Sequence, residues 1–359
     1  MLNVVEERIV RPVFFDLSDS QDLEALAKLK GEGRVWRESD QIRTQISELI
    51  KLRNPSIKRD AAGLEAEVDT HLGDQKPEEY GVWVWYPWSG ELVHLLPEKE
   101  FIEVRTNRNR NKINTEEQEK LAEFSIGVIG LSVGQSVCLT LAMQRGFGEL
   151  RIADFDSLEL SNLNRIRSGV SELGLSKVAI TAREIAEIDP FLRVKCFWDG
   201  VNEDNLHEFL IGESKLDLLI DECDDLKIKV MTRIQARKLK IPVVMETSDR
   251  GMLDIERFDQ ETDLKLFHGR VGSDEEIRQL LNTNPIALAT SIMNLSAVSR
   301  RGLESFQEMG KTLSAWPQLA EDVILGGATA SKVARSICLN EPIKSGRYYI
   351  DVNEIISSS

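Results

Sequence analysis

Carboxylate, amide and cationic side chains are concentrated in residues 153–177, which read ADFDSLELSNLNRIRSGVSELGLSK. They follow a predicted buried strand, so they should lie at the carboxyl edge of a parallel sheet. Upstream, the apolar run FSIGVI at 124–129 turns at Gly130 into a predicted helix, whose N-terminus at the same edge suits a phosphate. A nucleotide is therefore the first ligand to expect.

The loop GLSVGQS at 130–136 is an altered phosphate-binding loop. It keeps the first glycine of a GxGxxG pattern but has Ser132 and Gln135 in the second and third positions. An acidic residue about 20 positions further on is the expected partner of a ribose hydroxyl, and Asp154 and Asp156 stand there. The loop alone does not separate NAD from ATP.

The cations after the loop favour ATP, because nucleotidyl transfer must neutralise a triphosphate whereas a nicotinamide site needs few cations. The cations are Arg165, Arg167 and Lys177, and the amide of Asn162 is a further polar group beside them. A carboxylate for magnesium should follow another strand, and the run DECDD at 221–225 directly follows LDLLI. Capping of the next helix by Asp224 or Asp225 is the alternative, and one run can serve both roles.

Composition limits the classes of protein. The chain has 359 residues, 42% of them hydrophobic, and a net charge of −15, which argues against a nucleic-acid surface. The N-terminus MLNVVEERIV lacks the cationic start of a secretory signal, and no apolar run approaches about 18 residues, so we expect a cytoplasmic protein that does not enter the membrane. The four cysteines are far apart in the sequence and form no CxxC pair: Cys138, Cys196, Cys223 and Cys338. This spacing predicts buried thiols and no zinc site.

Alternating β and α patterns between residues 125 and 259 predict a doubly wound, Rossmann-like α/β fold with a mostly parallel sheet. The predicted strands are 125–130, 149–154, 193–197, 216–221 and 241–246, with helices starting near Gly134, Ser176, Glu203 and Asp225. The tail after residue 283 predicts two amphipathic helices, and its GGATA run at 326–330 would let a helix approach the sheet closely. We place this nucleotide-binding domain at 116–359.

Residues 1–115 predict a separate, smaller α+β domain. Residues 4–17 are strand-like, 19–30 and 39–53 helical, and 56–76 a polar segment, before a hairpin in GVWVWYPWSGELVHLL at 81–96. Its residues Trp83, Trp85 and Trp88 could form a peptide-binding face, but their size favours packing onto a neighbour. On charge alone, the basic cluster at 105–112 is as well explained by a solvated linker.

Over about residues 105–350 the chain resembles the ubiquitin-activating (E1-like) enzymes of the ThiF and MoeB type. The resemblance rests on Gly130, ADFDSLELSNLNR, GLSK at 174–177, IDP at 188–190 and the acidic run at 221–225. It implies that ATP and Mg²⁺ are used to adenylate a carboxylate. The family's paired CxxC zinc motifs are absent, so the chain is similar to a zinc-less variant with an N-terminal extension.

The resemblance also implies roles for residues of the loop and the first strand ends. Gly130 would let the backbone approach the phosphates. Because the loop departs from the family's pattern, the phosphate contact would use either Ser132 or a different backbone path. Asp154 would hold the ribose, with Asp156 beside it.

Further roles fall on the charged residues that follow. Asn162 and Arg165 would contact phosphates, Lys177 would lie near the triphosphate, and Asp224 would hold the magnesium ion. In this family an arginine of the partner subunit often enters the site from an RxxR pattern, which RTNR at 105–108 matches. Arg108 is then the candidate, and a homodimer is implied.

The implied reaction is attack by a substrate carboxylate on the ATP α-phosphorus, giving an acyl-adenylate and pyrophosphate. A carboxylate is ionised near pH 7, so no general base is needed. The expected substrate is a peptide or a ubiquitin-like protein recognised by the N-terminal extension, and no cysteine stands in an evident crossover loop for a thioester step. Two alternatives stay open: an NAD-dependent oxidoreductase and a non-catalytic E1-like nucleotide-binding scaffold.

Overall fold

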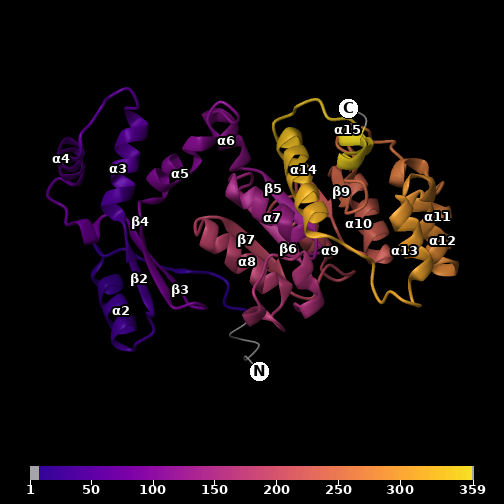
Figure 1. Cartoon of the computed structure of the whole chain (residues 1–359), viewed down its shortest axis with the longest axis horizontal. Helices are drawn as coiled ribbons and strands as arrows, with labels where there is room; N and C mark the ends of the chain where they lie inside the picture. Colours follow the sequence, from indigo (N-terminus) through magenta and orange to yellow (C-terminus); the bar gives the residue numbers. More distant parts are fainter. Residues whose placement is uncertain (1–7, 358–359) are drawn as a thin grey trace. The chain divides into compact units, whose positions relative to one another are not determined.

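The computed structural model describes residues 8–357 and divides into two compact units (Figure 1). The N-terminal unit comprises Met1–Thr115 together with Ile185–Phe191, and the main unit comprises Glu116–Glu184 and Leu192–Ser359. Each unit has its own sheet. Within residues 8–357, no helix combines the length and the apolar composition that crossing a membrane would require.

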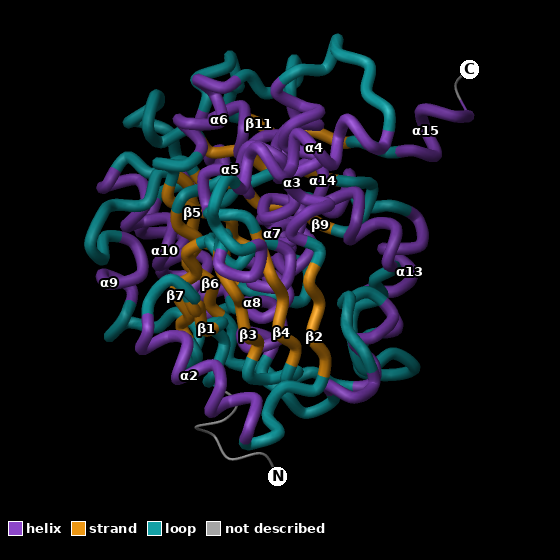
Figure 2. Tube along the Cα trace, turned by 90° about the vertical axis from the view of Figure 1, so that its left-hand side faces the viewer, coloured by secondary structure: helices purple, strands orange, loops and turns teal. Residues whose placement is uncertain are grey.

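The N-terminal unit is built on a four-stranded sheet of order β1-β3-β4-β2, three of whose strands run side by side in Figure 2. The predicted hairpin is confirmed, because β3 and β4 pair antiparallel. Its elements are β1 (Val13–Phe15), α2 (Ser20–Gly31), β2 (Arg37–Asp40), α3 (Ile42–Arg53), α4 (Ala61–Leu72), η1 (Pro77–Glu79), β3 (Val82–Tyr86), β4 (Glu91–Leu95), α5 (Glu98–Thr106) and η2 (Asn107–Asn109).

Three local predictions for this unit need correction. The strand expected at 4–17 is only Val13–Phe15 within the described residues, and residues 1–7 lie outside them. Residues 39–40 are not helical but end β2, which pairs in parallel with β4. The polar segment contains α4, which begins where the Asp60 carboxylate accepts the N–H of Gly63 at 2.7 Å.

The tryptophans of the hairpin mostly serve packing. Trp83 and Trp85 are 4% and 5% exposed and share an apolar cluster with Phe15. Trp88 is partly buried and donates its indole N–H to Glu187 at 2.6 Å. The packing interpretation is therefore confirmed for Trp83 and Trp85.

The main unit contains a seven-stranded sheet of order β11-β10-β9-β8-β5-β6-β7. The five strands from β9 to β7 in this order are parallel, and β10 and β11 add an antiparallel edge that the sequence analysis did not predict. The strands are β5 (Ser125–Ile129), β6 (Glu149–Ala153), β7 (Arg193–Phe197), β8 (Leu218–Asp221), β9 (Val243–Thr247), β10 (Met252–Glu256) and β11 (Gly346–Tyr349). The predicted mostly parallel α/β fold is confirmed.

Helices cover both faces of this sheet (Figure 1). The α-helices are α6 (Thr115–Leu121), α7 (Gly134–Met143), α8 (Lys177–Ile188), α9 (Leu206–Leu210), α10 (Leu226–Leu239), α11 (Asp274–Thr283), α12 (Pro285–Met293), α13 (Arg300–Glu308), α14 (Ala320–Cys338) and α15 (Val352–Ser357). Short 3₁₀ turns are η3 (Leu160–Asn164), η4 (Val170–Glu172), η5 (Leu266–Gly269) and η6 (Leu295–Ala297).

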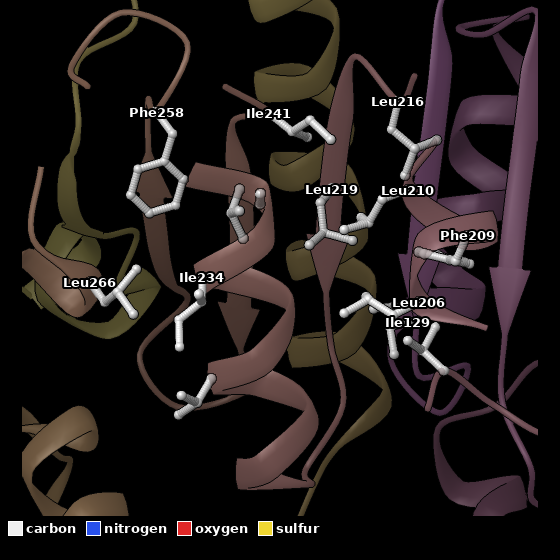
Figure 3. Packing of buried hydrophobic residues seen from close by; sticks show 14 of the residues in the cluster. Ile129, Leu206, Phe209, Leu210, Leu216, Leu219, Ile234, Ile241, Phe258 and Leu266 are labelled. Atoms are coloured by element: carbon white, nitrogen blue, oxygen red, sulfur yellow. The ribbon is translucent and has the colours of Figure 1, made fainter. Parts of the chain in front are cut away.

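Consecutive residues of β5 show which helices cover which face. A side chain at Gly127 would meet Phe209 of α9, whereas a side chain at Gly134 of α7 would meet Val128. Because neighbouring residues of a strand point to opposite faces, α7 and α9 lie on opposite faces. Figure 3 shows the packing on the α9 side, where Ile129 and Leu219 of the sheet meet Phe209 and other buried residues.

Helix α14 lies beside α7 and approaches the sheet closely. A Cβ atom at Gly326 would come within 2.2 Å of the Glu246 carboxylate carbon of β9, and one at Gly327 within 2.2 Å of the Ser136 hydroxyl. The contact at Gly326 is with β9, which confirms the close approach to the sheet predicted from the GGATA run, and the contact at Gly327 is with α7.

Candidate nucleotide-binding site

Gly130 begins the loop between β5 and α7 and has two reasons to be glycine. Its φ is +87°, a left-handed conformation that costs other residues energy. A Cβ there would lie 2.7 Å from the carbonyl oxygen of Glu222, in the loop after β8. The Gly130 N–H donates to the carbonyl of Ala153 at 2.8 Å, so the loop is fixed to the end of β6.

Replacing Gly130 with alanine is expected to destabilise the protein by at least about 1–2 kcal/mol, through the left-handed strain and the collision with Glu222. Gly174 is the matched control: its φ is also +87°, but nothing lies within 4 Å of a Cβ atom there. We expect Gly130→Ala to lower the thermal unfolding midpoint and the affinity for ATP more than Gly174→Ala does. Equal effects of the two variants would contradict the close approach.

Asp154 connects the glycine loop to the loop after β6. One carboxylate oxygen accepts the N–H of Leu131 at 2.6 Å and the other accepts the N–H of Asp156 at 2.8 Å. The side chain is 8% exposed, and burial raises its pKa although Lys177 and these N–H groups favour ionisation. A carboxylate can accept about four hydrogen bonds, so two positions remain for a ribose hydroxyl.

Arg165 brings together side chains from three segments. Its Nε atom donates to the Ser132 hydroxyl at 3.1 Å, and its Nη1 donates to the Asn164 side chain at 3.0 Å. Partial burial lowers the pKa of Arg165, and the nearby Asp224 carboxylate opposes this shift. The structure therefore places Arg165 at the same sheet edge as Ser132 and Asp224.

Asn162 and Lys177 are held in place by neighbours in the same loop. Asn162, in η3, is 8% exposed and accepts the N–H of Glu159 through its amide oxygen at 3.0 Å. Lys177 begins α8, and its 7% exposed side chain donates to the Asp156 carboxylate at 2.8 Å. Asp156 is therefore the counter-ion of Lys177 in this structure.

The two acidic residues before α10 have different roles. Asp225 caps the helix, because its carboxylate accepts the N–H of Ile228 at 3.0 Å. Asp224 is exposed and is not the capping residue. Residues 8–357 contain no group of three or more His, Cys, Asp or Glu side chains able to hold a metal ion. One exposed carboxylate fits Mg²⁺ that is also held by phosphates and water, as this ion prefers.

Cys223 lies beside Asp224 but is not an activated thiol. Its Sγ–H donates to the Asp221 carboxylate at 2.9 Å, and burial together with that negative charge raises the pKa of the thiol. The prediction of four buried thiols is right for Cys138 and Cys338 and wrong for Cys196 and Cys223, which are only partly buried.

Arg108 lies in η2 of the N-terminal unit and is exposed. Arg105, from the same RTNR run, lies 3.5 Å from the Asp189 carboxylate within this unit. Within the main unit, Arg165 contacts Ser132 and lies near Asp224, Lys177 pairs with Asp156, and Asp154 contacts the glycine loop, whereas Arg108 belongs to a different unit. Its entry into a partner's site stays a prediction.

Gln135 stands where a dinucleotide fold has its third glycine, and its role was missed by sequence analysis. It is 2% exposed, and its amide donates to the carbonyl of Arg167 at 2.9 Å and to Glu184 at 3.0 Å. Its oxygen accepts the N–H of Arg167 at 2.9 Å. The altered glycine loop therefore fixes the segment that carries Arg165.

A second missed feature is a cavity of about 370 Å³ that shares Val133 and Asp224 with the site. Its wall includes two neighbouring carboxyl groups, since Glu222 accepts the backbone N–H of Glu246 at 3.1 Å. Glu246 is 4% exposed, and burial raises its pKa to about 8. Burial and the charge of Glu246 also raise the pKa of Glu222. A single acidic residue on an apolar strand gave little signal in the sequence.

Glu246 should make stability fall with increasing pH. Its pKa is raised from 4.5 in the unfolded chain to about 8, so its contribution is fully present below about 4.5 and is lost as pH rises through 8. We expect Glu246→Gln to abolish this decrease in the free energy of unfolding, which amounts to up to about 1.4 kcal/mol per pH unit between about pH 4.5 and 8. Urea unfolding at pH 5 and pH 8 measures it, with the exposed Glu304→Gln as control. An unchanged pH dependence in Glu246→Gln would contradict the buried carboxyl.

Sequence comparison matches residues 106–260 to the ThiF family. Among curated relatives, the chain is 42% identical over 278 residues to "Uncharacterized protein MT1398" of Mycobacterium tuberculosis (strain CDC 1551 / Oshkosh), covering 77% of this chain and 38% of the relative. It is 28% identical over 120 residues to "Ubiquitin-like modifier-activating enzyme 5" of Drosophila virilis, covering 33% of this chain and 30% of the relative. The chain thus spans well under half the length of these relatives.

Solved structures that match the chain include two from Escherichia coli. The tRNA N6-threonylcarbamoyladenosine dehydratase TcdA in complex with ATP matches with a TM-score of 0.49 and 17% identity, covering 67% of this chain and 95% of that chain. MccB matches with a TM-score of 0.45 and 14% identity, covering 72% of this chain and 78% of that chain.

Proposed function

We propose that the protein is an ATP-dependent adenylyltransferase that activates a carboxylate of a peptide or small protein as an acyl-adenylate. The observation that carries this proposal is the convergence of Arg165, Ser132 and Asp224 beside the Gly130 loop. Cationic, hydroxyl and carboxylate groups from three strand ends form the set that a nucleoside triphosphate with its metal requires.

Each residue of this set has a distinct task in the proposed reaction. Gly130 leaves room for the phosphates, and Asp154 presents free acceptor positions to the ribose. Arg165 and Lys177 neutralise the triphosphate. Lys177 would do so by replacing part of its contact with Asp156 by a contact with the phosphates. Asp224 is the residue that would hold Mg²⁺, which when bound offsets negative charge on the phosphate oxygens.

The substrate carboxylate would enter through the adjacent cavity, which shares Asp224 with the nucleotide site. The carboxylate is already ionised, so the reaction requires positioning and charge neutralisation rather than a base. The protonated Cys223 supports no thioester at that position. Catalysis therefore ends, in this proposal, with an acyl-adenylate and pyrophosphate.

Recognition of the substrate is assigned in this proposal to the N-terminal unit. Similarity to ubiquitin-like modifier-activating enzymes supports a ubiquitin-like protein as one substrate class, and a peptide is the other. The proposed active form is a homodimer with Arg108 of each copy directed at the phosphates of the other.

Product analysis tests the proposed reaction. The protein is incubated with Mg²⁺, ATP and candidate carboxylates, namely short peptides and a ubiquitin-like protein, and nucleotides are separated by chromatography. We expect AMP and pyrophosphate in equal amounts and only with a suitable carboxylate. Formation of ADP and phosphate, or binding of NAD in place of ATP, would contradict adenylyl transfer.

A further inference from the structure

The cavity beside the nucleotide site has mainly apolar walls. It lies between the ends of β8 and β9 and the segment that contains α12, and it belongs wholly to the main unit. Its apolar lining includes Met245, Met252, Ile292, Met293, Trp316 and Tyr349. Walls of this kind fit an aliphatic chain.

Two polar side chains in the wall lack hydrogen-bond partners among the described residues. Both carboxylate oxygens of Glu246 are buried and unpartnered, and so is the Ser248 hydroxyl. Glu246 is 4% exposed and lies against Gly326, where no side chain could satisfy it. Unsatisfied buried carboxyl groups are costly, so this end of the cavity is built for a ligand that donates hydrogen bonds.

The charges around Glu246 determine which donor fits. Glu222 and Asp249 also line the cavity, and the negative charge of Asp322 reaches Glu246. The cation in the lining, Lys229, already donates to the Asp221 carboxylate at 3.0 Å. At the Glu246 end of the cavity a positively charged group is therefore favoured over an anionic one.

We propose that this cavity binds a primary ammonium group of the substrate, located close to the carboxylate that reacts. Glu246 and Ser248 accept hydrogen bonds from the ammonium, and the methionine and aromatic walls contact its aliphatic stem. The inference rests on the proposed function, because that function identifies the ligand as the carboxylate substrate. It adds that the substrate is an amine-bearing carboxylate, such as a chain with a lysine side chain near the activated end.

A divalent metal ion is a poor alternative occupant of the Glu246 end of the cavity. The described residues include no group of three metal-binding side chains, and the walls of the cavity are mostly apolar. An ammonium group needs only a few acceptors and tolerates apolar contacts along its stem.

Binding of n-butylammonium to the full chain without nucleotide tests the inference. Isothermal titration or ligand-observed NMR compares it with n-butanol, which has the same stem and no charge. We expect n-butylammonium to bind at least about tenfold more tightly than n-butanol, and Glu246→Gln to remove that preference. Ala289→Phe, which fills the cavity from α12 and keeps Glu246, should abolish binding of both.

The outcomes separate this inference from the proposed function. Equal binding of the amine and the alcohol, or an unchanged preference in Glu246→Gln, would overturn the inference. Retention of amine binding in Ala289→Phe would also overturn it, because binding would then lie outside the cavity. Selective amine binding by a protein that forms no AMP would uphold the ammonium site and count against the proposed adenylation alone.

Discussion

Asp224→Ala is expected to slow adenylation by at least about 10²-fold, with a smaller loss of ATP affinity. Asp224 is the exposed carboxylate at the end of β8, close enough to Arg165 to influence its pKa. Its removal would leave Mg²⁺ without a protein ligand while the fold is unchanged. Raising the Mg²⁺ concentration should restore part of the rate, and the rate of AMP formation at several Mg²⁺ concentrations measures this.

Asp225→Asn is the matched control, since this neighbour caps α10 and an asparagine can also cap a helix. We expect it to retain nearly the full rate. Arg165→Ala should lose as much activity as Asp224→Ala, whereas Arg167→Ala should lose little, because its side chain is 70% exposed and lies 3.6 Å from Glu184. Similar rates for Asp224→Ala and Asp225→Asn would show that the site is wrongly assigned.

Arg233→Met is expected to destabilise the main unit by about 3–5 kcal/mol. Arg233 of α10 is fully buried and pairs with the carboxylates of Asp221 and Glu256, the latter at 2.7 Å. Although burial opposes ionisation, Lys229 and Arg233 hold the pKa of Asp221 well below its usual value. Removing the guanidinium leaves two carboxylates buried with too little positive charge.

Thermal and urea unfolding of the purified variants measure this effect. Arg237→Met is the control: it lies one turn further along α10, and its side chain is 23% exposed and pairs with Asp274 near the surface. A pair of this kind contributes about 0–1 kcal/mol. If Arg233→Met costs no more than Arg237→Met, the buried charges do not depend on one another as described.

Much of the main unit could be predicted because the hydrophobic pattern of each segment agrees with its place in the sheet. The run LDLLID is mostly apolar, as expected of a strand covered on both faces, and its last four residues form β8 in the middle of the sheet. The helix α4 was missed because most of its residues face solvent and only Val68 and Leu72 are buried. Strands β10 and β11 pair across about 90 residues, a contact that no local pattern encodes.

The candidate site was predictable where motif and strand end coincide. Asp154, Asn162, Arg165 and Lys177 follow one strand within a single run, so their proximity to the Gly130 loop follows from sheet topology. Glu246 was not predictable, because its significance depends on burial against Gly326, 80 residues away. The sequence of a strand does not show whether a carboxylate in it is solvated or buried without a hydrogen-bond partner.

Exchange of labelled pyrophosphate into ATP tests the central claim most directly, because it detects the reversible formation of an acyl-adenylate without knowledge of the later steps. We predict exchange that requires Mg²⁺ and a carboxylate substrate, that is strongly reduced in Arg165→Ala, and that persists in Arg167→Ala. Exchange at the same rate in wild type and Arg165→Ala, or its absence with every carboxylate when ATP is bound, would contradict the account.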